Sequence, residues 1–322
     1  MKVLVTGSEG SLMQATIPIL IRNGWEVTGV DNQSRHGSYA RERDYTFHSD
    51  DLTSPEVARR LTAHQDMVIQ AAATIYGVGG FHKYPGTILS NDLTLHANLL
   101  RSSVASGVSR FVYISSSMVY ERCDHAPSSE DDSCLRERVP STDYGLSKLV
   151  GERLCRAFSQ EFGLAYTVWR PFNIITPLEE ADAQPGVSHV FADFKRRIID
   201  ERASSLPLIG DGEQVRCFTW IDDIASAIAQ FSNDVRTANQ VFNLGNPRPV
   251  TMRTLAQMIF ERAKDNGLFG ENEELSFSSG STFEDDVRFR MPSVARARDI
   301  LGWSPQVSLE DALDRCFTKW MG

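Results

Sequence analysis

Tyr144 and Lys148 are the pair in this sequence best suited to acid–base chemistry. Residues four apart share one face of a helix. A free phenol has a pKa of about 10, and a neighbouring ammonium lowers that pKa by stabilising the phenolate. The phenolate can then take a proton from an alcohol while hydride leaves the same carbon. Ser116, within a run of three serines at 115–117, supplies a hydroxyl that can hold the reacting oxygen.

A turn near the N-terminus is predicted to bind the hydride acceptor. Gly7 and Gly10 follow an apolar run at 2–5 and open a helical pattern at about 11–23. Glycines let the backbone approach a pyrophosphate, whose charge the helix N-terminus favours. Asp31, after the next strand pattern, can accept hydrogen bonds from both ribose hydroxyls and repels a 2′-phosphate, which favours NAD over NADP. The expected NAD-binding residues are Gly7, Glu9, Gly10, Ser11, Leu12, Asp31, Asn32, Asp51, Leu52, Ala72, Ala73, Tyr144 and Lys148.

The elements that must position these residues alternate along the first half of the chain. Short apolar runs at 2–5, 26–30, 67–71, 111–115 and 166–169 are separated by helical patterns, the longest near 87–106 and 144–162. Such alternation predicts an α/β fold, a Rossmann-type doubly wound parallel sheet with ligands at the carboxyl ends of the strands. Pro18 is expected to kink the first helix, because it removes one hydrogen bond.

A smaller α/β lobe is predicted after Pro171, where the alternation stops. The run 240–244 reads as a strand that returns to the main sheet. We therefore expect an NAD-binding domain at 1–170 with a return segment at about 218–246, and a substrate-binding lobe made of 171–217 and 247–322.

Composition excludes several classes of partner. The net charge of −9 disfavours a nucleic-acid backbone. No apolar run approaches the roughly 20 residues of a membrane helix, and the N-terminus lacks the features of a secretory signal, so a cytoplasmic protein is expected. Five scattered cysteines without CxxC spacing (Cys123, Cys134, Cys155, Cys217 and Cys316) indicate reduced thiols and no metal site.

Taken together, these motifs resemble the extended short-chain dehydrogenase/reductase family, and within it the nucleotide-sugar epimerases and dehydratases. Over nearly the whole chain, the resemblance includes the glycine turn, Asp31, 115–120, Tyr144 and Lys148, 170–173, 210–216 and 301–305. It implies that Ser116, Tyr144 and Lys148 are catalytic. It also implies a bound nucleotide-diphosphate sugar whose diphosphate is held by Asn173, Arg216 and Arg288, since the planar fork of arginine suits phosphate. Tyr76 and Ser117 are further expected substrate-binding residues.

Departures from the family pattern reduce the number of reactions that this chain is expected to catalyse. Met13 replaces the third glycine of the turn, so we expect the first helix to sit further from the sheet. Ile175-Thr176 and Cys217 also replace residues typical of the family. Related dehydratases carry an Asp-Glu pair where this chain has Ser117-Met118. A methionine can neither donate nor accept the proton that elimination requires, which disfavours a 4,6-dehydratase and the decarboxylase branch.

Other segments resemble two particular branches. The stretches 77–80 and 188–190 are similar to GDP-fucose synthase, and 218–222 is similar to GDP-mannose 3,5-epimerase. Those enzymes use a cysteine beside the catalytic serine and a second acid, either histidine or lysine. Here Met118 stands at the cysteine position, while His189 stands at that of the histidine and could act as an acid or base near neutral pH. Tyr76 and His82 could also reach the sugar.

The simplest chemistry that the retained residues support is 4-epimerisation through a transient 4-keto sugar. The alternatives are a 3- or 5-epimerase or C4-oxidoreductase that uses His189, and an unusual dehydratase. A non-catalytic NAD-binding module is the remote alternative, because such proteins typically lose the tyrosine or the lysine. The helical patterns near 87–106 and 144–162 resemble the pair that forms a four-helix dimer interface in this family, so we expect a homodimer.

Overall fold

The computed structural model describes residues 1–34, 42–123, 126–179, 181, 188–282 and 287–322. A sheet of seven parallel strands forms its centre, in the order β11-β6-β5-β4-β1-β2-β3. The strands are β1 Lys2–Thr6, β2 Glu26–Asp31, β3 Thr46–Ser49, β4 Met67–Gln70, β5 Arg110–Ile114, β6 Ala165–Pro171 and β11 Gln240–Leu244. The predicted doubly wound parallel sheet is confirmed, including the returning strand at 240–244.

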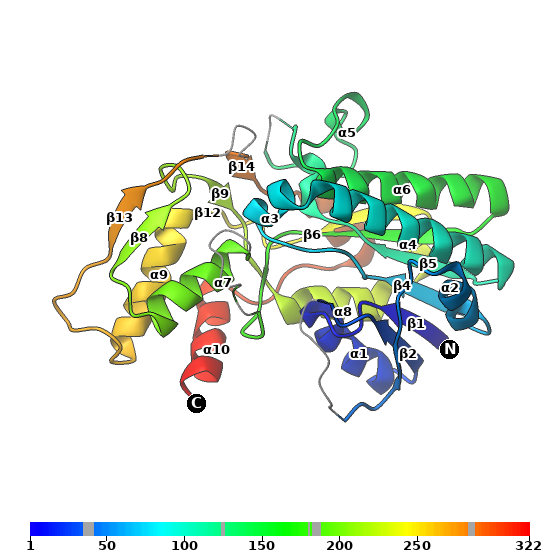
Figure 1. The fold of residues 1–322 in the computed structure, drawn as a ribbon, viewed down its shortest axis with the longest axis horizontal. Helices are drawn as coiled ribbons and strands as arrows, with labels where there is room; N and C mark the ends of the chain where they lie inside the picture. The colour runs from blue at the N-terminus through cyan, green and yellow to red at the C-terminus, as the bar shows by residue number, and fades with distance from the viewer. Residues whose placement is uncertain (35–41, 124–125, 180, 182–187, 283–286) are drawn as a thin grey trace.

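Helices cover both faces of this sheet (Figure 1). On one face α4 packs between α2 and α6, and on the other α1 packs against α8. Their bounds are α1 Ser11–Arg22, α2 Pro55–Thr62, α4 Pro85–Ala105, α6 Asp143–Phe162 and α8 Ile221–Phe231. The helix α1 continues across Pro18, and Met13 is buried in the core between α1 and the sheet. None of the described helices combines the length and the apolar character that a membrane span requires.

A smaller lobe lies beside the sheet, at the left of Figure 1. Its core joins apolar residues of its helices to a pair of parallel strands, β8 and β13. The elements are β7 Ile174–Ile175, α7 Val190–Phe194, the π-helical turn η2 Lys195–Asp200, β8 Ser205–Leu208, β9 Val215–Arg216, β10 Thr219–Trp220, β12 Val250–Thr251, α9 Met252–Asp265, β13 Ser276–Ser279, β14 Phe289–Arg290 and α10 Leu309–Met321. Between β14 and α10, Ala297, Leu301 and Trp303 pack into the core of the central sheet instead.

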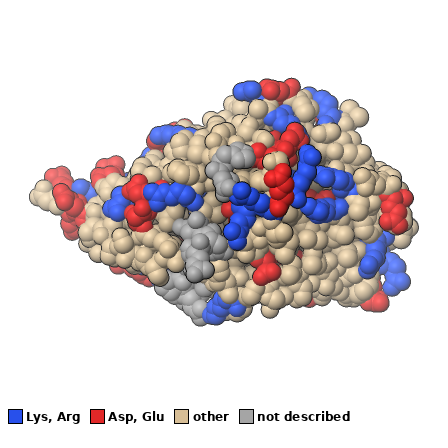
Figure 2. Space-filling model, turned by 90° about the horizontal axis from the view of Figure 1, so that it is seen from above, with Lys and Arg blue, Asp and Glu red and all other residues tan. Residues whose placement is uncertain are grey.

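Short helical segments complete the chain. They are α3 Val78–Lys83, η1 Ser117–Tyr120, α5 Cys134–Glu137, η3 Val235–Thr237 and η4 Ala297–Leu301. Two of them, α3 and η1, follow the carboxyl ends of β4 and β5, where ligands of a parallel sheet bind. On the surface seen in Figure 2, basic and acidic side chains are interspersed, so this face carries no uniformly basic area of the kind that attracts a nucleic-acid backbone.

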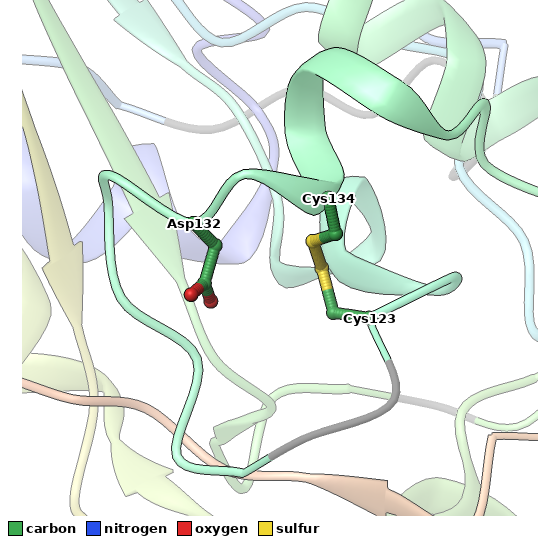
Figure 3. A group of neighbouring side chains, drawn as sticks. All are labelled: Cys123, Asp132 and Cys134. Atoms are coloured by element: carbon green, nitrogen blue, oxygen red, sulfur yellow. A yellow bond between two sulfur atoms is a disulfide. The ribbon is translucent and has the colours of Figure 1, made fainter.

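One expectation about the cysteines is wrong. Cys123 and Cys134 form a disulfide, with their Cα atoms 5.5 Å apart, a separation typical of such a bond. Figure 3 shows this disulfide beside the carboxylate of Asp132, which accepts a hydrogen bond of 2.9 Å from the backbone N–H of Ser129. Sequence spacing could not reveal the pair, because it is the packing of α5 against η1 that brings the two residues together.

The disulfide predicts the number of reactive thiols. Cys155, Cys217 and Cys316 are free and buried. We expect alkylation of the denatured, unreduced protein to modify these three cysteines, and alkylation after reduction to modify all five. Mass spectrometry of the alkylated chain gives the count. Five modified cysteines without reduction would contradict the disulfide.

Candidate active site

The carboxyl edge of the sheet provides a backbone cradle at the turn after β1. Gly7 has a φ of +66°, and a Cβ there would lie 2.8 Å from the backbone nitrogen of Ala72. Only glycine suits both the left-handed backbone and the close approach. In the part of the chain that the structure describes, no side chain caps α1 at Gly10, so the first N–H groups of the helix can face a diphosphate. These features fit the pyrophosphate of a dinucleotide.

The other predicted cofactor residues lie at this edge as well. Asp31 ends β2, and its Oδ2 accepts a hydrogen bond of 3.1 Å from the backbone N–H of Glu9. Leu52 is buried, while Asp51 is exposed and accepts hydrogen bonds of 2.8 Å from Thr53. The half-buried Ala72 donates its N–H to the Thr6 hydroxyl. Ala73 is half-buried next to it, Ser11 and Leu12 open α1, and Asn32 follows Asp31.

The pair Tyr144 and Lys148 is buried on the first turns of α6. The ammonium of Lys148 donates a hydrogen bond of 3.1 Å to the carbonyl of Ile114 at the end of β5, and it lies 5.6 Å from the centre of the Tyr144 ring. Burial lowers the pKa of Lys148, while the carboxylates of Asp92 and Glu152 act in the opposite direction. The ammonium is thus fixed between the phenol and the strand that leads to Ser116.

An apolar layer covers the phenol. The ring of Phe81, on α3, stacks on Tyr144 with the centroids 4.5 Å apart and the planes within 5° of parallel. Met118 and Ile88 belong to the same buried cluster. These contacts exclude water from the ring and fix its plane, while Lys148 supplies the nearby positive charge.

A buried carboxylate sets the start of α6. Thr142 caps the helix by accepting a hydrogen bond of 3.0 Å from the N–H of Gly145. The Glu121 carboxylate, just after η1, accepts hydrogen bonds of 2.9 Å from both the N–H and the hydroxyl of Thr142. A Cβ at Gly145 would lie 2.8 Å from the Met118 carbonyl oxygen. The capping and the close contact hold the segment of Ser116 and Met118 against the helix that carries Tyr144.

A chain of buried polar groups lies behind Ser116. The Ser115 hydroxyl donates a hydrogen bond of 2.5 Å to Glu152, which forms a two-pronged ion pair with Arg170 at 2.6 and 2.8 Å. Arg170 also donates to the Tyr120 hydroxyl, which donates in turn to Asn243 at 2.8 Å. The network joins β5, α6, β6 and β11, so it fixes the strand end from which Ser116 projects.

Two buried ionisable groups of α4 face the same helix. Asp92 accepts hydrogen bonds from the Thr74 N–H (2.9 Å) and the Ser147 hydroxyl (3.1 Å), and burial raises its pKa. His96 lies between Tyr113 and Gly151, and its ring nitrogens have no hydrogen-bond partner among the described residues. Burial, together with the positive charge of Lys148, lowers the pKa of His96 to about 3.

His96 makes the stability of the protein depend on pH. Its folded pKa lies below its unfolded value, so between these values the unfolded chain binds more protons and acid favours unfolding. We expect His96 to cost about 1.4 kcal/mol of unfolding free energy for each pH unit below about 6.5. Urea unfolding at pH 7 and pH 5 measures this, and His96→Phe should reduce the loss.

The exposed His64 supplies the matched control for this measurement, and its positive φ suits the replacement His64→Asn. This variant should lose stability with pH as the unaltered protein does. If His96→Phe lost as much unfolding free energy between pH 7 and pH 5 as the unaltered protein, His96 would not contribute to the pH dependence.

The arginines of the smaller lobe differ in their surroundings. Arg216 is buried on β9, and the strand pairing places Arg290 of β14 directly opposite. The buried Arg290 contacts the sulfur of Met118. Arg288, the predicted residue, is half-exposed and forms an ion pair of 3.0 Å with Asp211. Asn173 donates a hydrogen bond of 3.0 Å to the Cys217 carbonyl.

The remaining predicted residues lie in different settings. His189 precedes α7, with a side chain 46% exposed and its Nδ1 2.5 Å from Glu179. Tyr76 is half-buried and its ring packs at a tilt of 35° against that of Tyr84, with the centroids 5.0 Å apart. His82 is exposed on α3, and Ser117 is buried at the start of η1.

Sequence reasoning missed four side chains of this region. Arg290 stands two positions after Arg288, and the period of two in a strand gives both the same face, so only the pairing with Arg216 distinguishes them. Phe81 directly follows the Gly77–Gly80 stretch, which was the available signal. Asp92 and Glu121 carry no local signal, because their partners are distant in the chain.

The glycine turn after β1 and the buried tyrosine–lysine pair lie at the same edge of the sheet, an arrangement that fits an NAD-dependent enzyme. A model of the NAD dependent epimerase/dehydratase family matches residues 3–245, so the chain belongs to this family. It is 26% identical over 318 residues to GDP-mannose 3,5-epimerase 1 of Oryza sativa subsp. indica, covering 97% of this chain and 80% of that protein. It is also 26% identical over 325 residues to UDP-glucuronate 4-epimerase of Thermodesulfobacterium geofontis, covering 97% and 94%.

A solved structure supports the same assignment. The UDP-glucose 4-epimerase of Thermotoga maritima, solved with UDP-glucose, superposes with a TM-score of 0.82 at 27% identity, and 100% of each chain is covered. The predicted resemblance to nucleotide-sugar epimerases and dehydratases, the enzymatic character and the NAD cofactor are confirmed.

Proposed function

We propose that the protein is a nucleotide-sugar 4-epimerase that acts through a transient 4-keto sugar. The observation that carries this proposal is the buried Tyr144–Lys148 pair beside Ser116, at the sheet edge that also holds the turn of Gly7 and Asp31. The similarity to UDP-glucose 4-epimerase and UDP-glucuronate 4-epimerase supports it.

The geometry supports the following roles. The glycine turn after β1 and Asp31 would hold NAD, which would supply the acceptor and donor of the C4 hydride. Tyr144 takes the proton of the C4 hydroxyl, and the ammonium of Lys148 stabilises the phenolate. Ser116 donates a hydrogen bond to the same oxygen. After the 4-keto sugar turns over, Tyr144 returns the proton as hydride reaches the opposite face. No further acid or base is required.

We assign the nucleotide diphosphate to the smaller lobe at 171–217 and 247–322, apart from the stretch 294–303. Arg216 and Asn173 keep their predicted roles, together with Tyr76 and Ser117 near the sugar. Arg290 joins Arg216, because both guanidinium groups are buried and lie on facing strands. Arg288 takes a peripheral role, since it is ion-paired with Asp211.

A 3- or 5-epimerase is the second candidate, favoured by the similarity to GDP-mannose 3,5-epimerase. Inverting a carbon next to the ketone needs an acid and a base on opposite faces. Met118 carries no transferable proton. His189 is the candidate group, but it is half-exposed and hydrogen-bonded to Glu179. The geometry therefore favours the 4-epimerase.

Solvent labelling separates these functions. The protein is incubated with NAD in deuterated water and, in turn, with UDP-glucose, UDP-glucuronate and GDP-mannose, and the products are examined by NMR. We expect a C4 epimer without deuterium, because hydride returns to the carbon it left. Deuterium at C3 or C5 would instead establish flanking acid–base chemistry. NAD binding without turnover of any nucleotide sugar in a wider panel would contradict the proposal.

We also propose a homodimer formed by α4 and α6. Partly exposed apolar side chains recur every four residues on α6, and a similar row lies on α4. The α6 row is Leu146, Val150, Leu154, Phe158 and Phe162, and the α4 row is Leu89, Leu93 and Ala97. Such rows form a continuous apolar stripe on a helix surface, which is stable when a second surface covers it.

The dimer is tested by sedimentation equilibrium. The unaltered protein should sediment at twice the chain mass, and Val150→Glu should shift it toward the monomer, because the new charge would be buried in the interface. Arg298→Glu, a change on the distant η4 segment, should leave the dimer intact. A monomeric unaltered protein would contradict this assembly.

A further inference from the structure

A second carboxylate lies at the cofactor turn besides Asp31. Glu9 sits between Gly7 and Gly10, and its side chain is only 2% exposed. Its backbone N–H donates to the carboxylate of Asp31 at 3.1 Å. Asp31 and Glu9 are therefore in direct contact.

The Glu9 carboxylate is held by the segment that leads into β3. Arg43 binds it with two prongs, Nε to Oε1 at 3.3 Å and Nη2 to Oε2 at 3.1 Å. The Tyr45 hydroxyl donates a further hydrogen bond of 2.9 Å to Oε1. The guanidinium of Arg43 stacks on the ring of Phe47 at 4.0 Å. Paired and stacked in this way, Arg43 is directed to Glu9.

A glycine in β2 makes this arrangement possible. A Cβ at Gly29 would overlap the ring of Tyr45 and would lie 2.9 Å from the Ser8 side chain. Because Gly29 has no side chain, the Tyr45 ring can lie against β2, and its hydroxyl reaches Glu9 in the turn after β1. Arg43 and Tyr45 therefore hold the buried Glu9 carboxylate beside Asp31, and Gly29 leaves the space that this requires.

We propose that Glu9 is a second determinant of cofactor choice, which excludes NADP by neutralising Arg43 and by adding a negative charge next to Asp31. A 2′-phosphate brings about two negative charges and is bound by arginine in sites that accept it. Asp31, Glu9 and Arg43 together carry a net charge of −1. Replacing Asp31 alone leaves the Glu9–Arg43 pair closed, so the guanidinium of Arg43 stays bound to Glu9.

The experiment measures cofactor binding directly, by calorimetric titration of the full chain with NAD or NADP and without a sugar. The proteins are the unaltered chain, Asp31→Ser, Asp31→Ser with Glu9→Gln, and this double variant with Arg43→Met added. Glutamine keeps the shape of Glu9 and can still accept from Tyr45, but it no longer neutralises Arg43.

We expect Asp31→Ser alone to tighten NADP binding little. Adding Glu9→Gln should tighten it by about 10- to 100-fold, the effect of one charge-assisted hydrogen bond. Adding Arg43→Met should abolish that gain. Glu26→Gln is the matched control, because it removes the same charge from an exposed residue at the opposite end of β2 and should change neither affinity.

Two results would overturn the proposal. The first is that the folded double variant binds NADP no more tightly than Asp31→Ser does. The second is that the tighter NADP binding persists after Arg43→Met is added. Circular dichroism establishes folding. Should the double variant fail to fold, Arg43→Met in the Asp31→Ser background decides the question. It removes the positive charge of Arg43 from the Glu9 carboxylate, so NADP should bind more weakly while NAD binding changes little. Unchanged NADP binding would refute the proposal.

Discussion

Tyr144→Phe should lower the rate of sugar turnover by about 10²- to 10⁴-fold, the range that one positioned acid–base group contributes. The change removes only the hydroxyl, so the ring keeps its stacking on Phe81 and its place in the apolar cluster. Lys148 keeps its hydrogen bond to the Ile114 carbonyl. NAD affinity should therefore stay within about threefold of the unaltered protein, a difference of less than 1 kcal/mol.

Rapid-quench kinetics measures the rate of sugar turnover, and calorimetric titration measures the NAD affinity. The matched control is Tyr166→Phe, which removes the same atom from a buried tyrosine of β6 and should leave the rate unchanged. A Tyr144→Phe variant that turns over its sugar at a rate close to normal would show that another group accepts the proton, and the proposed mechanism would fail.

Features set by local spacing could be predicted from the sequence. Tyr144 and Lys148 lie on one face of α6 because four residues make about one turn. Gly7 and Asp31 end neighbouring parallel strands, so the alternation of strands and helices brought them to one edge. These positions follow from the chain's own periodicity.

Features set by contacts between distant segments could not be predicted. Glu121 binds Thr142, the cap of a helix that begins 22 residues later in the chain. Asp92 accepts a hydrogen bond from Ser147 between two packed helices. Arg290 is distinguished from Arg288 only by the register of β14 on β9. The disulfide depends on the turn that follows η1. In each case the contact depends on how distant segments pack together, and the spacing of nearby residues in the sequence does not determine that packing.

Arg170→Met should lower the free energy of unfolding by about 3–5 kcal/mol, the cost of breaking a buried ion pair by removing one partner. Arg170 and Glu152 are 3% and 5% exposed. Among the described residues, Glu152 also accepts a hydrogen bond from the Ser115 hydroxyl. Methionine approximates the length of the arginine stem but leaves the carboxylate uncompensated. The loss should also disturb Ser115 and Tyr120, and through them the strand end that carries Ser116.

Urea unfolding followed by circular dichroism measures the change. Adding Glu152→Leu to Arg170→Met should recover part of the loss, because an apolar pair removes the buried charge altogether. Arg298→Met is the control, since Arg298 pairs with Asp299 on the surface and such exposed pairs contribute little. A free energy of unfolding of Arg170→Met within about 1 kcal/mol of that of the unaltered protein would contradict this prediction. It would show that another group compensates the Glu152 carboxylate, and that the ion pair does not fix the strand end before Ser116.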